Sequence, residues 1–262
     1  MERHGPNLSV QHDYTAMPPA RSSVIGRQHP FTGHGRSWMI EAIRAPARTS
    51  SGERAMDDSV HKAMARWPDV PAVYGYIGVN HRGDFLLQGH VVTHERTREF
   101  IHRNYGLDEH GRAFFQNGPQ RAYADLEATP WIYRLMDDGQ LRTHTEQPVA
   151  SLHEAGMTAD GDIVLVTEHG PGLLHAQDLD QLTNHLASDS QPLDDALAAL
   201  AAGADGGVTL TLPAGRVPVD ALGDAALPSR FRYTPQPEPD PDDPRSAVST
   251  HRPAWHPAPD AD

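Results

Sequence analysis

The feature that most constrains the fold is a dense run of aromatic residues between Ala113 and Leu135. This run holds five of the seventeen Phe, Trp and Tyr residues in the 262-residue chain: Phe114, Phe115, Tyr123, Trp131 and Tyr133. Aromatic residues that alternate with small or polar ones suit a half-buried, pleated strand. Asn117-Gly118 lies between two such runs and is a strong hairpin signal. The sequence therefore predicts that a β-ribbon bent at Asn117-Gly118-Pro119 forms the centre of the core.

The two ends of the chain differ from its middle in composition. Residues 1–55 and 235–262 are rich in Pro, Gly, Ser, Arg or Asp and have little apolar periodicity. Such segments bury too little apolar surface to offset the entropy of ordering them. We therefore expect a disordered leader over residues 1–55 and a disordered, acidic, proline-rich tail over residues 235–262. The helical pattern that follows Met56 predicts that the folded unit begins there.

Local patterns in the middle of the chain predict short strands and helices in alternation. A first helix is expected to take its N-cap from Asp57 to Ser59 and to stop at Pro68. A second is expected to end in a left-handed cap at Gly106, and a short helical turn is expected from Asp220. Other helices are predicted over 178–186 and 191–203, and strands over 71–79, 84–88, 91–92, 140–145, 163–166, 173–174, 208–212 and 217–219.

These elements indicate an α+β fold built from antiparallel β hairpins packed with a few helices. We expect the core domain to span residues 56–186. A small appended α/β unit is expected over residues 187–234, between the core domain and the disordered tail. Strands that follow one another through short turns pair most simply as hairpins, which is why an antiparallel arrangement is predicted.

Charge and composition exclude several functional classes. Residues 56–227 carry 11 Lys and Arg against 25 Asp and Glu, a formal charge of −14. This balance repels phosphate backbones, so we expect no nucleic-acid partner and no binding to anionic membranes. No apolar run has the length of a membrane span. The chain has no cysteine, which excludes thiolate metal sites and disulfides and favours a cytoplasmic location.

Recognisable catalytic motifs are missing from the sequence. There is no Gly-x-Ser-x-Gly elbow and no phosphate-binding glycine loop, and the seventeen histidines are scattered without metal-ligand spacing. We therefore expect no cofactor and no metal site, and favour a protein without catalytic activity. The alternative is a small enzyme of unfamiliar type that uses carboxylate and imidazole groups such as Asp125, Glu127 and His144 for acid–base work.

One polar motif is richer than its turn requires. The hairpin needs Asn117-Gly118-Pro119, but it does not need the flanking Gln116, Gln120 and Arg121. Amides and a planar guanidinium could bind a carboxylate or a protein surface. Strand alternation places Arg121, Tyr123, Asp125 and Glu127 on one face. We predict a binding surface that comprises Gln116, Asn117, Gln120, Arg121 and Tyr123, although a purely structural hairpin would use the same residues for internal polar bonds.

Several segments resemble an uncharacterised family of proteobacterial proteins known only as a domain of unknown function. The resemblance rests on Trp67-Pro68, Tyr74-Gly-Tyr-Ile-Gly78, Phe100 to Tyr105, Leu126 to Pro130, His144-Thr145 and above all the run from Phe114 to Arg121. It covers about residues 56–186. The resemblance implies no activity, and no residue role can be carried over from it. Our hypothesis is therefore a cytoplasmic binding or regulatory module whose ligand is an unknown protein or small molecule.

Overall fold

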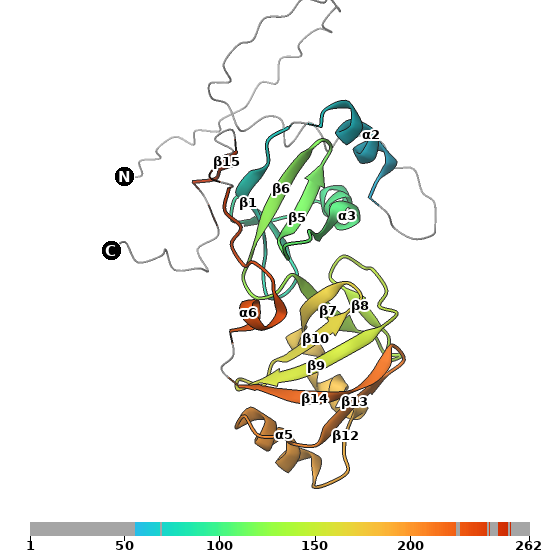
Figure 1. The fold of residues 1–262 in the computed structure, drawn as a ribbon. Helices are drawn as coiled ribbons and strands as arrows, with labels where there is room; N and C mark the ends of the chain where they lie inside the picture. The colour runs from blue at the N-terminus through green and yellow to red at the C-terminus, as the bar shows by residue number, and fades with distance from the viewer. Residues whose placement is uncertain are drawn as a thin grey trace, which may run out of the picture. The chain divides into compact units, whose positions relative to one another are not determined.

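The described residues form two mixed β-sheets with short helices (Figure 1). The structure is a computed structural model, and it describes residues 56–68, 70–223, 226–239, 241, 246–250 and 252. The predicted α+β class is confirmed. The leader predicted over residues 1–55 lies outside the described residues. That Met56 begins the folded unit therefore stays a prediction.

The first sheet is built around the predicted aromatic ribbon. Its strands follow the order β3-β2-β1-β6-β5-β4, and β15 pairs with β1. The bounds are β1 Val73–Val79, β2 Phe85–Leu87, β3 His90–Val91, β4 Tyr105–Leu107, β5 Ala113–Asn117, β6 Gln120–Leu126 and β15 Ala247–Val248. The ribbon itself is the β5–β6 hairpin, in which Phe114 lies opposite Tyr123. Gly118 takes a φ of 57° at the bend, a left-handed conformation that costs glycine little.

Pairing within the first sheet is only partly antiparallel. The hairpins β1–β2, β2–β3, β4–β5 and β5–β6 are antiparallel. This pairing was predicted for β1–β2 and β5–β6, whereas no strand was predicted at the position of β4. The central pair β1–β6 is parallel, and its register shifts between Tyr74 and Ile77, where β1 forms a bulge. The connection between β1 and β6 contains helix α3, Glu95–Asn104, as a parallel crossover requires.

The second sheet contains every remaining strand, including those predicted as a separate extension. Its order is β12-β13-β14-β9-β10-β11-β7-β8. The bounds are β7 Trp131–Leu135, β8 Leu141–Thr143, β9 Leu152–Thr158, β10 Ile163–Thr167, β11 Gly170–Leu174, β12 Leu186–Ser188, β13 Val208–Leu212 and β14 Gly215–Gly223. Strand β14 pairs in parallel with β9. The segment predicted as an appended unit over residues 187–234 therefore extends the same sheet, and the domain division stays a prediction.

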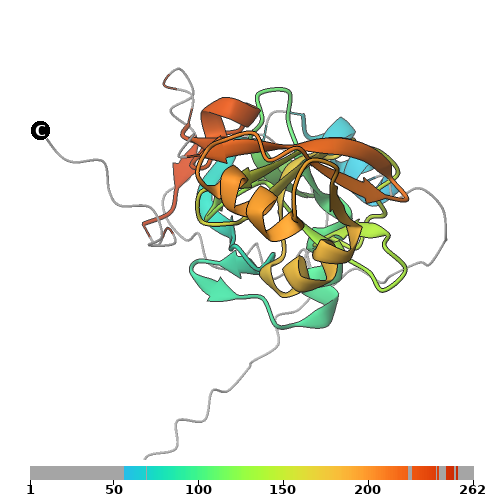
Figure 2. The same cartoon turned by 90° about the horizontal axis from the view of Figure 1, so that it is seen from below.

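The helices of the described residues are short. They are α2 Asp58–Arg66, η2 Ala176–Asp178, α4 Leu179–Leu182, η3 Thr183–His185, α5 Leu193–Ala201 and α6 Leu227–Phe231, in addition to α3. Helix α5 contacts β9, β12, β13 and β14, and it lies in front of the second sheet in Figure 2. None of the helices in the described part of the chain is long and apolar enough to cross a membrane.

Asp57 stands at the N-cap of α2, as predicted, although its side chain makes no capping hydrogen bond and its carboxylate pairs with Arg103 at 3.1 Å. Two other local predictions were wrong. Gly106 is not a left-handed cap, since α3 passes directly into β4. The turn predicted from Asp220 is strand, because β14 continues along β9 to Gly223. For Asp57 and Asp220 the partner is distant in sequence and outweighs the local preference, whereas the partner of Gly106 is the neighbouring strand β5.

Part of the predicted disordered tail is built into the first sheet. Pro235 accepts a hydrogen bond from the Leu126 amide, with N and O 2.7 Å apart. Farther along, β15 pairs in parallel with the start of β1, which places Ala247 opposite Val73. The described residues between 235 and 252 thus have backbone pairing that their low apolar content did not indicate. Disorder of the tail as a whole stays a prediction.

Candidate functional site

The two faces of β6 have different surroundings. Ala122, Ala124 and Leu126 are fully buried in the main core, which contains residues of both sheets. The intervening Arg121, Tyr123 and Asp125 lie on the opposite face, as strand alternation predicted. We call this side of β1, β5 and β6 the outer face. It carries a smaller aromatic cluster of Tyr74, Phe114 and Tyr123, so polar and aromatic groups lie side by side there.

The polar residues of the β5–β6 turn mostly bond to one another. Gln116 is buried, and its amide nitrogen lies 3.1 Å from the Gly118 carbonyl oxygen. Its carbonyl oxygen accepts from Arg121 Nε at 3.3 Å. Gln120 donates to the Pro71 carbonyl at 3.1 Å. Asn117 is also buried, and its Oδ1 has no partner among the described residues. The turn is therefore held internally, with Gln120 and Arg121 as its half-buried, partly accessible members.

Arg121 is expected to contribute modestly to stability. Its guanidinium carbon lies 4.0 Å from the centre of the Phe114 ring, and its Nε bonds to Gln116. We expect Arg121→Ala to lower the free energy of unfolding by about 1 kcal/mol, since a half-exposed cation–π contact and one hydrogen bond are lost. Urea denaturation measures this effect. Arg121→Lys retains charge and stacking and should cost less; a loss above about 3 kcal/mol would mean that the residue is mainly structural.

Tyr123 is held by contacts on three sides. Its ring stacks on Tyr74, with centroids 4.9 Å apart, and the Arg112 guanidinium carbon lies 4.5 Å from its centre. Its hydroxyl donates to Asp108 Oδ2 at 3.3 Å, and Arg112 Nε donates to the same oxygen at 2.7 Å. Burial alone would raise the pKa of Asp108, but hydrogen bonds from Arg112 and from the His110 amide bring it below its ordinary value. This carboxylate is therefore fully compensated.

Asp125, two residues farther along the same face, is in the opposite situation. Only 1% of its surface is exposed, and its Oδ1 has no hydrogen-bond partner among the described residues. Its Oδ2 lies 3.5 Å from Arg252 Nε, an ion pair without hydrogen-bond geometry. Burial raises the pKa of Asp125 to about 6, although the Arg252 charge opposes that rise. A buried carboxylate with so little compensation is costly, and such groups cluster at functional sites.

The groups considered for acid–base catalysis do not share partners. Glu127 Oε2 accepts from both the amide and the Nδ1 of His81, each at 2.7 Å. His144 follows β8 and is buried among Phe85, Tyr105 and Trp131. Burial lowers the pKa of His144 to about 3, so this ring is neutral at physiological pH. Among the described residues, Asp125, Glu127 and His144 therefore do not act on one another. The carboxylate–imidazole contact that is present joins Glu127 to His81, whose side chain is about half exposed.

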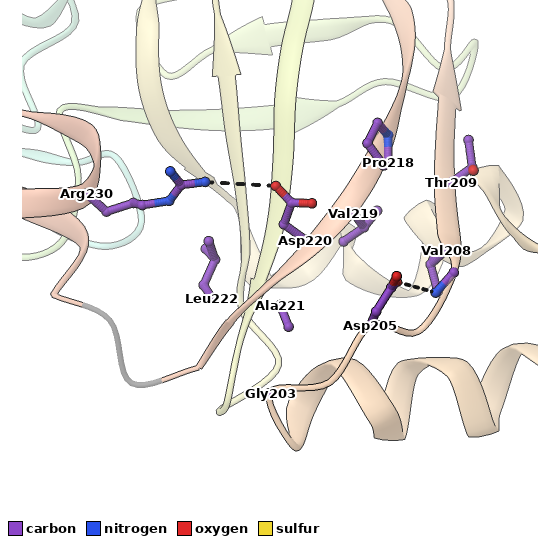
Figure 3. Close-up of a pocket in the computed structure, with 11 residues that line it drawn as sticks. Gly203, Asp205, Val208, Thr209, Pro218, Val219, Asp220, Ala221, Leu222 and Arg230 are labelled. Atoms are coloured by element: carbon purple, nitrogen blue, oxygen red, sulfur yellow. Dashed lines mark hydrogen bonds and ion pairs between the residues drawn. The ribbon is translucent and has the colours of Figure 1, made fainter.

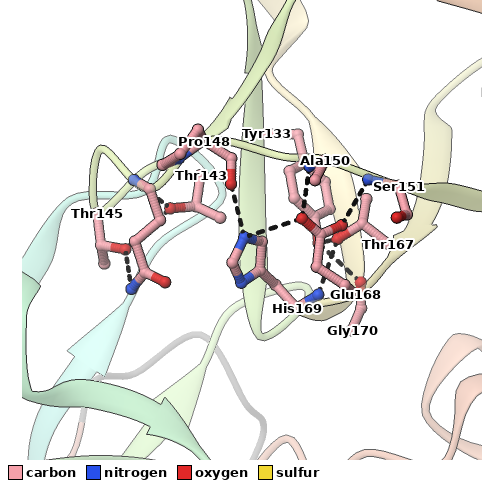
Figure 4. Close-up of polar contacts among 11 residues, drawn as sticks. Tyr133, Thr143, Thr145, Pro148, Ala150, Ser151, Thr167, Glu168, His169 and Gly170 are labelled. Carbon is pink, nitrogen blue, oxygen red and sulfur yellow. Dashed lines mark hydrogen bonds and ion pairs between the residues drawn. The ribbon is translucent and has the colours of Figure 1, made fainter. Parts of the chain in front are cut away.

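A second cluster has the residue types of a catalytic triad but not its geometry. Ser151, Glu168 and His169 come together beside β9 and β10 (Figure 4). Glu168 accepts from the backbone amides of Ala150 and Ser151 at 2.5 and 3.0 Å. His169 Nε2 faces the Pro148 carbonyl oxygen at 2.9 Å and not the serine hydroxyl. The contacts hold a loop in place, and they provide no hydrogen bond between nucleophile and base.

An open groove of about 750 Å³ lies between the end of α5, β13 and β14 (Figure 3). Asp205 there accepts from the Gly207 amide at 2.8 Å, and Arg230 lies 3.9 Å from Asp220. The side chains of Asp220 and Arg230 are about half exposed. Water therefore compensates these charges, and the groove lacks the buried, poorly compensated group that distinguishes Asp125. Among described residues no group of three acidic or histidine side chains could hold a metal ion.

The sequence singled out Asp125 only as one of three alternative acid–base groups, with Glu127 and His144. Its face was predictable from strand alternation, but its charge partner Arg252 lies in a segment for which disorder was predicted. No local signal linked the two residues. Conversely, the predicted surface residues Gln116, Asn117 and Tyr123 are buried and support the outer face from within.

Comparison with known proteins gives a family but no activity. A family model described as "Protein of unknown function (DUF2946)" matches residues 56–238. This agrees with the resemblance to an uncharacterised family, and the match extends beyond residue 186. No curated protein matches the chain.

Two solved structures are similar to part of the chain. A DUF1285 family protein from Silicibacter pomeroyi DSS-3 is 9% identical, with a TM-score of 0.45 over 70% of this chain and 95% of that one. A DUF1285 family protein from Shewanella baltica OS155 is 13% identical, with a TM-score of 0.34 over 42% of this chain and 91% of that one.

Proposed function

Because the chain belongs to the family described as protein of unknown function (DUF2946), whose description assigns no activity, we propose that it is a non-catalytic binding module. Its binding surface runs along the outer face from the Gln116–Arg121 turn to Asp125. Gln116, Asn117 and Tyr123 support this surface from within, and Gln120 and Arg121 form its accessible rim. The observation that carries the proposal is Asp125, a buried carboxyl with one oxygen unpartnered among the described residues.

The chemistry of this surface favours a cationic ligand. A guanidinium or ammonium group could donate to the free oxygen of Asp125 and offset the cost of its burial. Aromatic rings of Tyr74 and Tyr123 lie on the same face, and such rings attract cations as well. The formal charge of −13 acts in the same direction over longer range and disfavours nucleic acid. We also propose a cytoplasmic location, which the lack of cysteine in the sequence supports.

The proposal is tested with small probes of defined charge. Agmatine, its neutral urea analogue and a carboxylate of similar length are titrated into the full-length protein, and binding is followed through amide NMR signals of β1 and β6. We expect agmatine alone to shift these signals, and we expect Asp125→Asn to reduce its affinity at least about tenfold, as loss of a charge-assisted hydrogen bond requires.

Asp137→Asn is the matched control, since Asp137 is exposed on a turn of the second sheet. It should bind agmatine as the wild type does. Equal responses to all three probes, or an affinity that Asp125→Asn leaves unchanged, would refute a cation site. Chemical conversion of a bound probe would favour the enzymatic alternative.

A further inference from the structure

We propose that the ligand of this site is an arginine side chain on an extended peptide of a partner protein, and that the chain's own residues 246–252 occupy the site in its place. The inference rests on the proposed function and names its ligand. We call residues 246–252 the β15 segment; the structure describes all of them except residue 251.

The β15 segment fills an edge that β1 leaves open. On one side β1 pairs with β6 along most of its length. On the other side β2 covers only Ile77 to Val79. The β15 segment pairs with the uncovered beginning, opposite Val73 and Tyr74, and the Ser249 amide donates to the Tyr74 carbonyl at 2.9 Å (Figure 1). Addition of a strand to a free edge is a general mode of peptide recognition, in which side-chain pockets provide specificity.

A notch beside this edge accepts the arginine. Gly75 lies in the β1 bulge with a φ of 70°, and a Cβ atom there would overlap the Arg252 side chain. The absence of a side chain at Gly75 therefore makes the space through which Arg252 reaches Asp125. Only 16% of the Arg252 side chain is exposed. Its guanidinium also bonds to the Pro237 carbonyl at 2.8 Å and to the Glu238 carboxylate.

Arg252 fits this notch imperfectly. Its Nε lies 3.5 Å from Asp125 Oδ2 without forming a hydrogen bond, and Asp125 Oδ1 has no partner among the described residues. A guanidinium can instead donate two parallel hydrogen bonds to one carboxylate, which is shorter and stronger pairing. The β15 segment thus leaves binding energy unused, and a peptide that places its arginine squarely on Asp125 would displace it.

The site and its occupant come from different parts of the chain. Gly75 and Asp125 lie inside the family match over residues 56–238, whereas the β15 segment lies beyond it. A tethered segment acts at an effective concentration of the order of millimolar, so the same segment of a second copy would have no advantage over it. A partner peptide with a better-placed arginine would have an advantage over the tethered segment. We therefore infer that the partner is a different protein.

The experiment uses the full-length chain and a labelled peptide. The peptide is Ser-Ala-Val-Ser-Thr-His-Arg, the sequence of the β15 segment, amidated at its C-terminus, and a second version carries Gln in place of Arg. Fluorescence anisotropy gives the Kd for the wild type, Arg252→Ala, Arg252→Lys and the double variant Arg252→Ala/Asp125→Asn. Arg66→Ala is the control, since Arg66 is an exposed arginine on α2.

We expect Arg252→Ala to bind the arginine peptide at least tenfold more tightly than the wild type does. The reason is that the substitution weakens the β15 segment, which competes with the peptide for the site. Arg252→Lys should lie between Arg252→Ala and the wild type, and Arg66→Ala should equal the wild type. The glutamine peptide should bind at least tenfold more weakly than the arginine peptide. The double variant should bind the arginine peptide at least tenfold more weakly than Arg252→Ala does. Circular dichroism confirms that every variant is folded, and Arg252→Lys provides the comparison if Arg252→Ala is not.

Equal affinity of wild type and Arg252→Ala, or of the two peptides, would overturn the inference. So would a wild-type dimer in analytical ultracentrifugation that Arg252→Ala abolishes, since a second copy would then be the occupant. If agmatine still binds in an Asp125-dependent manner, these results leave the proposed function intact. If agmatine does not bind to the wild type or to Arg252→Ala, the proposed function itself fails.

Discussion

Asp125→Asn is expected to raise the melting temperature by about 3 to 5 °C at pH 7.5, although it removes a charge that faces Arg252. Burial holds the pKa of Asp125 at about 6, above its ordinary value near 4, so the ionised form is the costly one in the folded protein. Asparagine has nearly the same shape and resembles the neutral acid. Thermal unfolding followed by circular dichroism measures the difference.

The sign of this effect depends on pH. A carboxyl with a raised pKa binds its proton more tightly in the folded state, so its stabilising contribution is complete below about pH 4 and is lost as the pH rises through about 6. The difference between wild type and Asp125→Asn should therefore vanish near pH 4 and reach its maximum above pH 7. A variant that is less stable than the wild type at pH 7.5 would contradict this account.

Asp108→Asn is the matched control with the opposite sign. Despite burial, hydrogen bonds from Arg112 and the His110 amide lower the pKa of Asp108. Its contribution is present above the unfolded pKa near 4 and is lost as the pH falls through the lowered value. The substitution should thus destabilise the protein at pH 7.5 and matter less in acid. Asp125 lies on β6, and Asp108 lies in the turn between β4 and β5 of the same sheet. Only the uncompensated Asp125 gains from neutralisation, as expected where binding is maintained at a cost in stability.

Gly111→Ala is expected to lower the free energy of unfolding by about 3 kcal/mol or more. Gly111 has a φ of 71°, and a Cβ atom there would collide with the backbone of Arg232 and Tyr233. At this point the chain returns to the first sheet, where the Thr234 amide donates to the Gly111 carbonyl at 3.0 Å. The backbone of Arg232 and Tyr233 cannot move aside as the tip of a side chain can. The alanine would therefore push this segment away from residue 111. Urea denaturation provides the measurement.

Gly118→Ala separates the collision from the cost of the left-handed conformation. Gly118 also has a positive φ, 57°, but nothing lies within 4 Å of its Cβ position. It should cost only the conformational term of about 1 kcal/mol. If Gly111→Ala and Gly118→Ala lower the free energy of unfolding equally, the contact between Gly111 and the backbone of Arg232 and Tyr233 does not contribute to stability.

The alternation of residues along a strand was sufficient to predict the aromatic hairpin and the shared face of Arg121, Tyr123 and Asp125. These features arise within about ten residues, where a turn signal and a period of two specify the geometry. The helix over Leu193–Ala201 was predictable for the same reason. The parallel pairs β1–β6 and β9–β14 were not, because their partners lie some 45 to 65 residues apart and no local pattern specifies which strands meet.

Sequence alone determined that the chain has an aromatic β core, an acidic middle and no recognisable catalytic motif. Only tertiary structure decided that Asp125 is buried, that Gly75 opens a notch beside it, and that Arg252 reaches it from a segment with little apolar content. Local composition measures how much surface a segment can bury by itself. Composition contains no information on partners elsewhere in the chain. Here an unpaired strand edge supplies hydrogen bonds and a buried carboxylate supplies charge, and together they can order that segment.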